Sequence, residues 1–405
     1  MKVLLLTHIY PTTGYPTRGT YIGNIFRVIS RMSETRVVCP VHWWKRLRGS
    51  TRQLNPPTDE FTGVPAIQPT VWTVPRIAPQ WNGESMYYSL RKQLERLRRK
   101  FDFDIIVAAW AYPDGFAAAR LARDFDCPLV IKTMGSDVLL MPKDPRLRGK
   151  ISWGLKQAQR IIAVSEDLKK NVQNLGIPSD SVVVRHNGVN GDLFTIKNRV
   201  DLRRHLGLPE HRRFISYVGR LSSEKGVDLL LQAMAGFCAS GPDDVDLLLV
   251  GSGVMQTEME SQVKQMGLEP RIRFCGERSH DEIADWISAS DVFCLPSRSE
   301  GCPNVILEAL ASGRPVVATR VGGVPELLTD SNGIMVPSED PDALAAGLMQ
   351  ALQRRWDPES IRRSVEYLSW DEVGAAYHSD LQAVLHEWKA VAADRSRHGL
   401  LMKGA

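Results

Sequence analysis

Cysteine is scarce in this chain and follows no functional spacing. The 405 residues include six cysteines: Cys39, Cys127, Cys238, Cys275, Cys294 and Cys302. None belongs to a CxxC pair, and none lies beside a histidine cluster in the sequence. This scatter argues against a disulfide framework and against the common zinc modules. We therefore expect reduced thiols.

Long hydrophobic runs are also missing. The opening MKVLLLTHIYP has five apolar residues before Thr7 and His8, which is too few for the core of a signal peptide. No later run approaches the length of a membrane span. We expect a cytoplasmic protein. A chain of this length, 43% hydrophobic and 24% charged, should fold as about two globular domains.

A large net charge is lacking too, but the charge is unevenly distributed. Residues 1–200 contain 30 Lys and Arg against 16 Asp and Glu, a net of +14, which leaves 21 against 30, or −9, for the rest. Much of the excess lies in HWWKRLRGSTR (42–52) and LRKQLERLRRK (90–100). The second segment predicts a helix with one cationic face, either at an anionic membrane surface or packed on its own domain. No nucleic-acid-binding motif accompanies the charge, so we expect no nucleic acid partner.

Strand-like runs alternate with helix-length segments in two series. The first extends from KVLLLT (2–7) to SVVVRHN (181–187), and the second from RFISYVGR (213–220) to PVVATR (315–320). Val/Ile/Leu-rich strands separated by helices favour parallel sheets that are covered on both faces. The pattern predicts an α/β protein of two doubly wound domains with an active site in the cleft between them. Residues 367–393 predict one or two further helices.

Two cations mark the first turn of the second series. The segment YVGRLSSEKG (217–226) follows a strand and places Arg220 and Lys225 at the entrance of a helix. A guanidinium and an ammonium next to free backbone N–H groups form a binding place for a phosphate or diphosphate. The alternative is a surface Arg and Lys that cap a loop.

Two glutamates flank a helix start in SEGCPNVILEALASG (299–313). Glu300 should lie in the loop, and Glu308 inside a helix that Pro303 or Asn304 opens and Gly313 ends. The N–H groups between the glutamates suit an anion. A ligand with hydroxyls at both ends and a central diphosphate, such as a nucleotide sugar, fits this set. The alternative is that Glu300 lies in a solvated turn and Glu308 on an exposed helix face. The backbone between the glutamates belongs to Gly301, Cys302, Pro303, Asn304 and Val305.

These segments, with VGSG (250–253) and NGIMVP, resemble the C-terminal domain of the family 4 retaining glycosyltransferases, also called glycosyl transferases group 1. Residues 163–194 and TMGSDV (133–138) are similar to the first domain of that family. The resemblance implies the GT-B fold, with two Rossmann-like domains facing a central cleft. It divides the chain into an acceptor-side domain (1–195), a nucleotide-sugar-binding domain (196–372) and helices that cross back to the first domain (373–405).

The resemblance implies retaining transfer of a sugar from a nucleotide-diphosphate sugar to a glycan or lipid-linked acceptor in envelope or exopolysaccharide synthesis. No metal or other cofactor is expected, and the enzyme would be cytoplasmic or peripheral on the inner face of the membrane. Arg220 and Lys225 would be catalytic by holding the diphosphate as the glycosidic bond breaks. Glu300 would bind the donor sugar and Glu308 the ribose, with backbone groups of 301–305 on the phosphates. Gly19 matches a glycine-rich loop that approaches the donor, although the family usually has two adjacent glycines there.

One departure from the family pattern lies in the first domain. Met134 stands where the family commonly has a histidine that contacts the donor sugar, and methionine forms only weak hydrogen bonds. Asp137 or Thr133 are candidates for a replacement contact, and Tyr112 is a candidate acceptor contact. Two alternatives therefore stay open: a donor-binding regulatory protein with weakened catalysis, or another GT-B enzyme such as a nucleotide-sugar epimerase.

Overall fold

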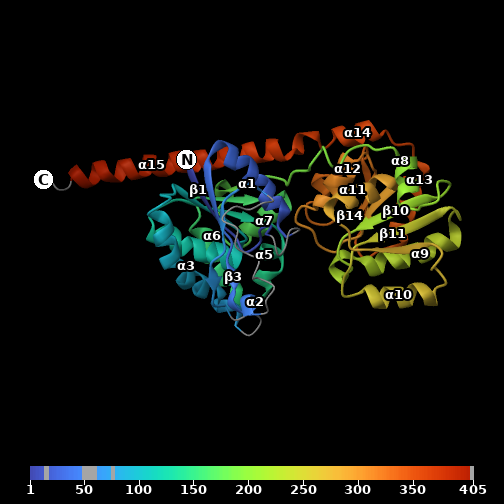
Figure 1. Ribbon diagram of the computed structural model, residues 1–405, viewed down its shortest axis with the longest axis horizontal. Helices are drawn as coiled ribbons and strands as arrows, with labels where there is room; N and C mark the ends of the chain where they lie inside the picture. The colour runs from blue at the N-terminus through green and yellow to red at the C-terminus, as the bar shows by residue number, and fades with distance from the viewer. Residues whose placement is uncertain (13–17, 48–61, 74–77, 402–405) are drawn as a thin grey trace. The chain divides into compact units, whose positions relative to one another are not determined.

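The computed structural model describes residues 1–12, 18–47, 62–73 and 78–401. The contacts divide the chain into two compact units, residues 1–186 together with 370–405, and residues 187–369. Each unit is built on its own parallel sheet with helices on both faces (Figure 1). This architecture confirms the predicted α/β class with two doubly wound domains.

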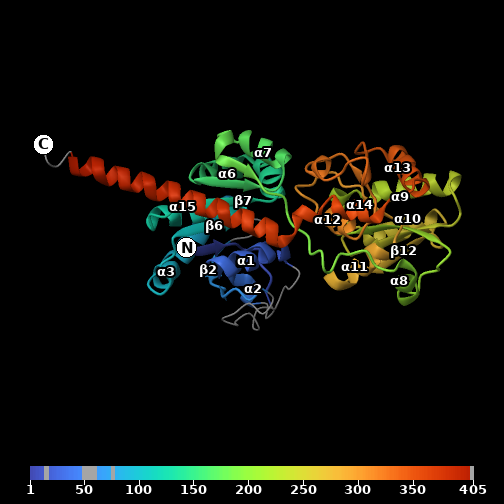
Figure 2. The same ribbon diagram turned by 90° about the horizontal axis from the view of Figure 1, so that it is seen from above.

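The first unit contains a seven-stranded parallel sheet in the order β4-β2-β1-β6-β7-β8-β9. The strands are β1 Lys2–Leu6, β2 Glu34–Val38, β4 Ala66–Ile67, β6 Ile105–Ala109, β7 Leu129–Thr133, β8 Arg160–Ala163 and β9 Val182–Val184. The helices are α1 Thr20–Met32, α2 Trp43–Leu47, α3 Asn82–Arg98, α4 Phe116–Asp124, α5 Ser136–Leu139, α6 Pro145–Lys156 and α7 Glu166–Gln173. Figure 2 shows α6 and α7 on one side of β6 and β7, and α1 on the other. A short ladder of β3 Val41–His42 and β5 Thr70–Val71 lies outside the main sheet.

The second unit repeats this plan with six parallel strands in the order β12-β11-β10-β13-β14-β15. The strands are β10 Arg213–Val218, β11 Val245–Val250, β12 Ile272–Gly276, β13 Val292–Leu295, β14 Val316–Thr319 and β15 Gly333–Val336. The helices are α8 Arg199–His205, α9 Val227–Ser240, α10 Gln256–Gln265, α11 His280–Ala289, α12 Asn304–Ala311, α13 Pro341–Gln353 and α14 Pro358–Arg363. In Figure 1, α9 and α10 lie on one side of the sheet, with α11 and α12 on the other.

Both sheets reverse their strand order beside their first strand. β1 lies between β2 and β6, and β10 lies between β11 and β13. In such sheets the chain leaves neighbouring strands in opposite directions, which opens a crevice at their carboxyl ends where ligands bind. Each unit therefore has one position at which the loops of two sequence-distant strands meet.

The last helix, α15 (Trp370–Leu401), belongs to the first unit and packs along α1 (Figures 1 and 2). A Cβ at Gly374 would lie 2.5 Å from Cβ of Val28, so this crossing requires a residue without a side chain. Asp380 accepts two hydrogen bonds from the Arg185 guanidinium, at 2.9 and 3.0 Å. The chain thus returns to its first sheet after it has built the second.

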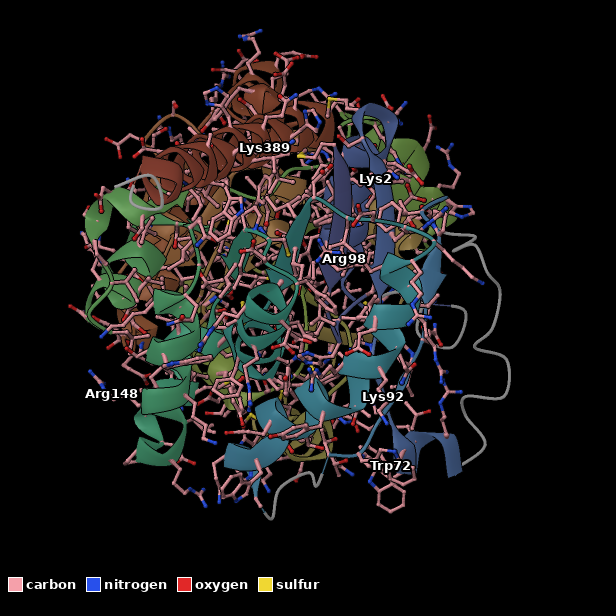
Figure 3. The ribbon with its side chains drawn as sticks, turned by 90° about the vertical axis from the view of Figure 1, so that its left-hand side faces the viewer. Lys2, Trp72, Lys92, Arg98, Arg148 and Lys389 are labelled. Atoms are coloured by element: carbon pink, nitrogen blue, oxygen red, sulfur yellow. The ribbon has the colours of Figure 1, made fainter. Side chains whose placement is uncertain are left out.

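Residues 90–98 of the basic segment 90–100 form the end of α3, and the apolar face of this helix is turned inward. Leu90 and Leu94 are 0% and 1% exposed, so the helix packs on its own unit. The outer face carries cations, and beside it Trp72 is 65% exposed; Figure 3 shows Trp72 and Lys92 at the same edge of the unit. The other basic segment, 42–52, is described only as far as residue 47. Within the described ranges, no helix is both long and apolar enough to span a membrane.

Candidate functional site

Lys225 and Glu300 meet at the point where the second sheet reverses its order. Lys225 ends the 3₁₀ turn that follows β10, and Glu300 lies in the loop that follows β13. Lys225 Nζ donates to Glu300 Oε1 at 2.6 Å, and Ser297 Oγ donates to the same oxygen at 2.6 Å. The two motifs come together because β10 and β13 are neighbours in the sheet.

The second oxygen of the Glu300 carboxylate is left for another donor. The residue is only 8% exposed, yet within the described part of the chain Oε2 accepts no hydrogen bond. A nearly buried carboxylate with one oxygen fixed and one unoccupied can accept a hydrogen bond from a hydroxyl in a defined direction.

Arg298 fastens the loop that carries Glu300. Its guanidinium donates two hydrogen bonds to Asp228, at 2.7 and 2.8 Å, and two to Glu339, at 2.5 and 3.1 Å. The hydrogen bonds from Arg298 hold the pKa of Asp228 below its usual range. The Arg298 backbone N–H also donates to the Glu224 carbonyl at 2.9 Å. One arginine therefore joins the Lys225 turn, the Glu300 loop and the start of α9.

Gly322 supports the same loop from the next strand. Its φ is +50°, and a Cβ at this position would lie 1.8 Å from the carbonyl oxygen of Glu300. Only a glycine allows this approach of the two backbones. Sequence analysis missed both Gly322 and Arg298, although the neighbouring glycines in RVGG and the arginine inside SRSEG were the available signals.

Arg220 stands apart from the contact between Lys225 and Glu300. Its side chain is 74% exposed, and its guanidinium comes no closer than 3.9 Å to the Glu224 carboxylate. Its backbone is nevertheless fixed, because the Tyr217 hydroxyl donates to the Arg220 carbonyl at 2.7 Å. The structure thus places this cation at the mouth of the same turn, with its side chain extended into solvent.

Glu308 projects from α12 and is held by a histidine that the sequence analysis did not identify. His280 Nε2 lies 3.1 Å from Glu308 Oε1, and this hydrogen bond raises the pKa of His280. At the start of the helix, Asn304 Oδ1 accepts a hydrogen bond from the Asn187 amide at 2.8 Å. Neither His280 nor Asn187 stands in a spacing pattern that could have revealed it.

The stretch that precedes α12 is mostly enclosed. Gly301, Cys302 and Pro303 are buried, and Asn304 and Val305 are half-buried. The first N–H groups of any α-helix have no carbonyl partner within the helix. The start of α12 therefore offers backbone donors beside the Glu300 carboxylate.

Three of the residues predicted in the first unit have structural roles. Gly19 begins α1, where a Cβ would lie 2.7 Å from the Ile9 carbonyl oxygen. Asp137 is 0% exposed and accepts backbone N–H groups of Ala111, Met134 and Gly135 at 2.9–3.1 Å. Burial raises the pKa of Asp137.

Tyr112 is 1% exposed; its hydroxyl donates to the Pro79 carbonyl and accepts from the Gly83 N–H, at 2.8 and 3.0 Å. Asp137 and Tyr112 thus hold loops in place and do not present their polar atoms to a surface. Met134 is half-buried directly after β7, and a contact from it to a sugar stays a prediction.

In the first unit, two side chains also meet at the point where the strand order of the sheet reverses. His8 follows β1 and Asp114 follows β6; the His8 backbone N–H donates to Asp114 Oδ1 at 2.9 Å, and the ring Nδ1 contacts Oδ2. Asp114 is fully buried. Trp110, which precedes it, has a φ of +106°, a strained value for a residue other than glycine. The strained turn places Asp114 against His8.

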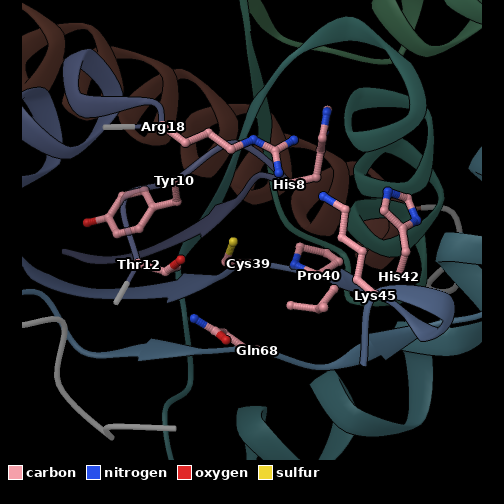
Figure 4. Close-up of a pocket in the computed structure, with 10 residues that line it drawn as sticks. His8, Tyr10, Thr12, Arg18, Cys39, Pro40, His42, Lys45 and Gln68 are labelled. Carbon is pink, nitrogen blue, oxygen red and sulfur yellow. The ribbon is translucent and has the colours of Figure 1, made fainter. Parts of the chain in front are cut away.

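His8 lines a pocket at the carboxyl ends of β1 and β2 (Figure 4). The other lining residues are Tyr10, Thr12, Arg18, Cys39, Pro40, Val41, His42, Lys45 and Gln68. No Asp or Glu is among them. Sequence analysis had not connected these residues, because they come from four separate segments.

Aspartates of DFD (102–104) and DVD (244–246), two segments with the Asp-x-Asp spacing of some metal sites, bind other groups of the chain. Asp244 receives two hydrogen bonds from Arg213, at 2.7 and 2.9 Å, and Asp104 accepts the Lys2 N–H at 2.7 Å. In the part of the chain that the structure describes, no group of three His, Cys, Asp or Glu side chains is arranged to hold a metal ion.

Two family models match the chain, one in each unit. The model described as Glycosyltransferase Family 4 matches residues 39–193, and the model described as Glycosyl transferases group 1 matches residues 212–354. A D-inositol 3-phosphate glycosyltransferase from Xylanimonas cellulosilytica is 30% identical over 315 residues, which cover 71% of this chain and 73% of the relative. The chain belongs to glycosyltransferase family 4. As a member of this family it is a transferase, as the sequence predicted.

Two further similarities cover nearly the whole of this glycosyltransferase and of the protein to which it is similar. The putative teichuronic acid biosynthesis glycosyltransferase TuaC from Bacillus subtilis is 26% identical over 370 residues, 89% of this chain and 91% of the relative. Among solved structures, HepE from Anabaena in complex with UDP superimposes with a TM-score of 0.72 at 21% identity, covering 95% of this chain and all of HepE. These similarities confirm the GT-B fold.

Proposed function

We propose that this glycosyltransferase moves a sugar, with retention of configuration, from a nucleotide-diphosphate sugar to a hydroxyl group of a glycan or lipid-linked acceptor. The observation that carries the proposal is the nearly buried Glu300 carboxylate, with one oxygen fixed by Lys225 and the other unoccupied. It lies beside the helix start that offers backbone donors. A hydroxyl acceptor, a cation and backbone N–H donors on neighbouring loops support the binding of a nucleotide sugar.

Each group has a role in the proposed reaction. Arg220 and Lys225 hold the diphosphate and stabilise the negative charge that develops on it as the bond between the anomeric carbon and the phosphate oxygen breaks. The acceptor oxygen forms the new bond on the same face of the sugar, and its proton passes to the departing phosphate. Glu300 Oε2 accepts a hydrogen bond from a sugar hydroxyl. Glu308 accepts hydrogen bonds from the ribose, which replace that of His280. Because both cations come from the chain, the proposal needs no metal ion.

The relatives support the choice of a first donor and of a biological setting. HepE has been solved with UDP and with UDP-glucose, so uridine nucleotides are the first donors to test. The name of TuaC refers to teichuronic acid biosynthesis, which supports a role in envelope polysaccharide synthesis.

We further propose that the enzyme acts in the cytoplasm at the inner face of the membrane, where the outer face of α3 would contact anionic lipids. Since Leu90 and Leu94 are buried, that contact would rest on cations and exposed aromatic residues.

The test combines binding with turnover. A ligand that binds only the folded chain raises its melting temperature. We expect UDP or UDP-glucose to stabilise the protein, Arg220→Ala to abolish this stabilisation, and Arg273→Ala, an exposed arginine on β12, to leave it unchanged. Release of UDP from UDP-glucose should then require an acceptor. If neither UDP, GDP, ADP nor their sugar conjugates stabilise the protein, the proposed donor site is wrong. Stabilisation without turnover on any acceptor would favour the regulatory alternative that Met134 suggests.

A further inference from the structure

We propose that the second unit binds a phosphate group between Arg199 and Arg314, at the amino ends of β13 and β14. The groups proposed to hold the donor, Lys225 and Glu300, follow the carboxyl ends of β10 and β13, on the opposite edge of the same sheet. The inference therefore concerns a separate site, and it does not depend on the proposed function.

Arginines from two segments surround one aspartate at this edge. Asp291 directly precedes β13, and Arg314 lies two residues before β14, the neighbouring strand. Arg199 and Arg203 come from α8, which packs against α11 (Figure 2). Arg203 Nη2 donates to Asp291 Oδ2 at 2.7 Å, and Arg199 Nη1 binds Oδ1. The Phe214 N–H also donates to Oδ2, at 2.7 Å. Both oxygens of the carboxylate are thus bound by groups other than Arg314.

The Arg314 side chain is buried and has few acceptors. The residue is 5% exposed, and its Nη1 donates to the Ser290 carbonyl at 3.3 Å. Its Nε is enclosed and has no hydrogen-bond partner. Within the described part of the chain, no carboxylate forms an ion pair with this guanidinium. A buried charge is costly unless a group of opposite charge accompanies it. An anion that accepts hydrogen bonds from the remaining N–H groups of Arg314 would be that partner.

The carboxyl end of α11 explains part of this arrangement. Arg203 Nε donates to the Ala289 carbonyl at 3.0 Å, and Arg314 donates to the carbonyl of the next residue, Ser290. Cations stabilise this end of a helix, where the last carbonyl groups lack partners within the helix. A guanidinium has five N–H donors, however, and the Ser290 carbonyl occupies one of those on Arg314. The helix end accounts for a cation at this place but leaves most of its donors unused.

Positive charge is in excess where these side chains meet. The guanidinium groups of Arg199, Arg203 and Arg314 face the single carboxylate of Asp291, so three positive charges against one negative leave an excess of two. Burial and the charges of Arg199 and Arg203 lower the pKa of Arg314 to about 10, although the Asp291 carboxylate acts in the opposite direction. Arg314 therefore stays charged at pH 8, and a bound anion would offset the repulsion.

Carboxylates on the surrounding elements do not remove this excess, because they are bound to other cations. These pairs are Asp285 with Lys197 at 2.8 Å, Glu210 with Arg204 at 3.0 Å and Asp244 with Arg213 at 2.7 Å. The excess is thus left for a group from outside the chain.

A phosphate group matches the site in charge and in hydrogen bonding. The Arg199 side chain is 41% exposed, so an anion can approach from this side. A phosphate ester carries nearly two negative charges at pH 8, which equals the excess, whereas a carboxylate carries one. Its oxygens also suit the planar fork of donors that each guanidinium presents. Inorganic phosphate and a phosphorylated small molecule share this chemistry.

The experiment measures the melting temperature of the full chain at pH 8, since a ligand of the folded state raises it. Sodium phosphate, glycerol 3-phosphate and acetate are compared with sodium chloride at equal ionic strength. We expect phosphate to stabilise the protein more than acetate or chloride does. The effect should persist in Arg220→Ala, in which the proposed donor site is weakened. Stabilisation by inorganic phosphate alone identifies the free ion as the ligand, and stabilisation by glycerol 3-phosphate as well identifies an organic phosphate.

Variants assign the binding to the arginines. Arg199→Gln should raise the Kd for phosphate, measured by calorimetry, about tenfold or more, because it removes a charged hydrogen bond. Arg204→Gln removes the same charge from an exposed position of the same helix and should leave the Kd unchanged. Arg314→Met should abolish the phosphate effect without lowering the melting temperature in chloride, because it removes an unpaired buried charge.

Several results would overturn the inference. These are equal stabilisation by phosphate, acetate and chloride, a wild-type Kd in Arg199→Gln, or equal losses in Arg199→Gln and Arg204→Gln. Loss of the phosphate effect in Arg220→Ala would assign the anion to the proposed donor site instead. An Arg314→Met protein that is destabilised equally with and without phosphate would show that Arg314 only caps α11. If that variant does not fold, the comparison of Arg199→Gln with Arg204→Gln decides.

Discussion

Lys225 Nζ lies 2.6 Å from Glu300 Oε1, across the neighbouring strands β10 and β13. The contact joins the group proposed to hold the diphosphate to the group proposed to hold the sugar. A carboxylate near a diphosphate would repel it, and the ammonium between them offsets that repulsion. Lys225 is the group proposed to bind the phosphate and Glu300 the group proposed to bind the sugar, so a change in either should act mainly on its own part of the donor.

The first prediction concerns the charge on Glu300. Glu300→Gln keeps the size of the side chain and one oxygen but removes the negative charge. Loss of a charged hydrogen bond costs about 1.5–3 kcal/mol, so we expect kcat/KM to fall roughly 10- to 150-fold. UDP lacks the transferred sugar that Glu300 is proposed to bind, so its affinity should stay within about threefold. Initial rates and UDP titrations measure both, and Glu269→Gln, exposed in the same unit, is the control. An unchanged rate would remove Glu300 from the site.

The second prediction tests how the Glu300 loop is held. Arg298→Lys keeps a positive charge but loses the planar fork that donates to both Asp228 and Glu339. We expect the free energy of unfolding to fall by about 1–3 kcal/mol, because the half-buried Asp228 carboxylate loses its paired hydrogen bonds from the guanidinium. The loop is then less well positioned, so kcat should fall even at saturating donor.

Urea unfolding and steady-state rates measure the two effects of this change. Arg273→Lys, on the exposed edge strand β12, is a matched control. A variant that loses stability and keeps the full kcat would show that Arg298 supports the fold but does not position Glu300.

The meeting of Lys225 and Glu300, on which the proposed donor site rests, was predictable because strands and the turns that follow them can be recognised in the sequence. Lys225 and Glu300 each follow a short apolar run that ends in a polar turn, and parallel strands bring such turns to one edge. Arg298 and His280 were not predictable in their roles, since each acts through a partner that is distant in the sequence and has no characteristic spacing.

Two residues of the first unit show that a sequence pattern does not reveal which groups a polar side chain binds. Asp137 and Tyr112 were predicted as candidate contacts of the sugar and the acceptor, and in the structure their polar atoms bind buried backbone groups. A sequence cannot distinguish an aspartate that faces a ligand from one that satisfies three N–H groups, because both follow a strand and precede a helix. Tertiary packing determines whether such a side chain faces a ligand or the backbone.

The third prediction is a pH dependence at His280. The Glu308 carboxylate raises the pKa of His280 above its unfolded value of about 6.5. The stabilisation is therefore fully present below that unfolded value and is lost as the pH rises through the folded value. Because the pair is partly exposed, we expect it to contribute only about 0.2–1 kcal/mol.

The measurement compares the wild type with His280→Gln by thermal unfolding at pH 5.5 and pH 8.5. The gap between their melting temperatures should be larger at pH 5.5. His211→Gln, a histidine without this partner in the same unit, is the control. A gap that is equal at both values, or larger at pH 8.5, would contradict the ion pair.

The fourth prediction tests membrane contact through the outer face of α3. Arg98 is excluded from the set to be changed, because its guanidinium packs over Phe103 and Phe125 and donates to Asp102. Replacing Lys92, Arg96, Arg99 and Lys100 with Gln should reduce co-sedimentation with vesicles rich in anionic lipid. Each cation near such a surface contributes about 1 kcal/mol. The difference should shrink as salt is added, since the attraction is screened.

A nonspecific attraction of the whole basic unit would also lose strength when four cations are removed. A second variant with the same change in charge distinguishes this case from a contact through α3. Arg123, Lys143, Arg148 and Lys170 are exposed cations of the same unit outside the outer face of α3, and their replacement with Gln changes the net charge by the same amount. If both variants lose binding equally, the whole basic unit is attracted and α3 has no special place. If neither does, the membrane proposal fails. Loss in the α3 variant alone would locate the contact beside the exposed ring of Trp72, and Trp72→Ala should then weaken binding further by removing an aromatic residue suited to the interface.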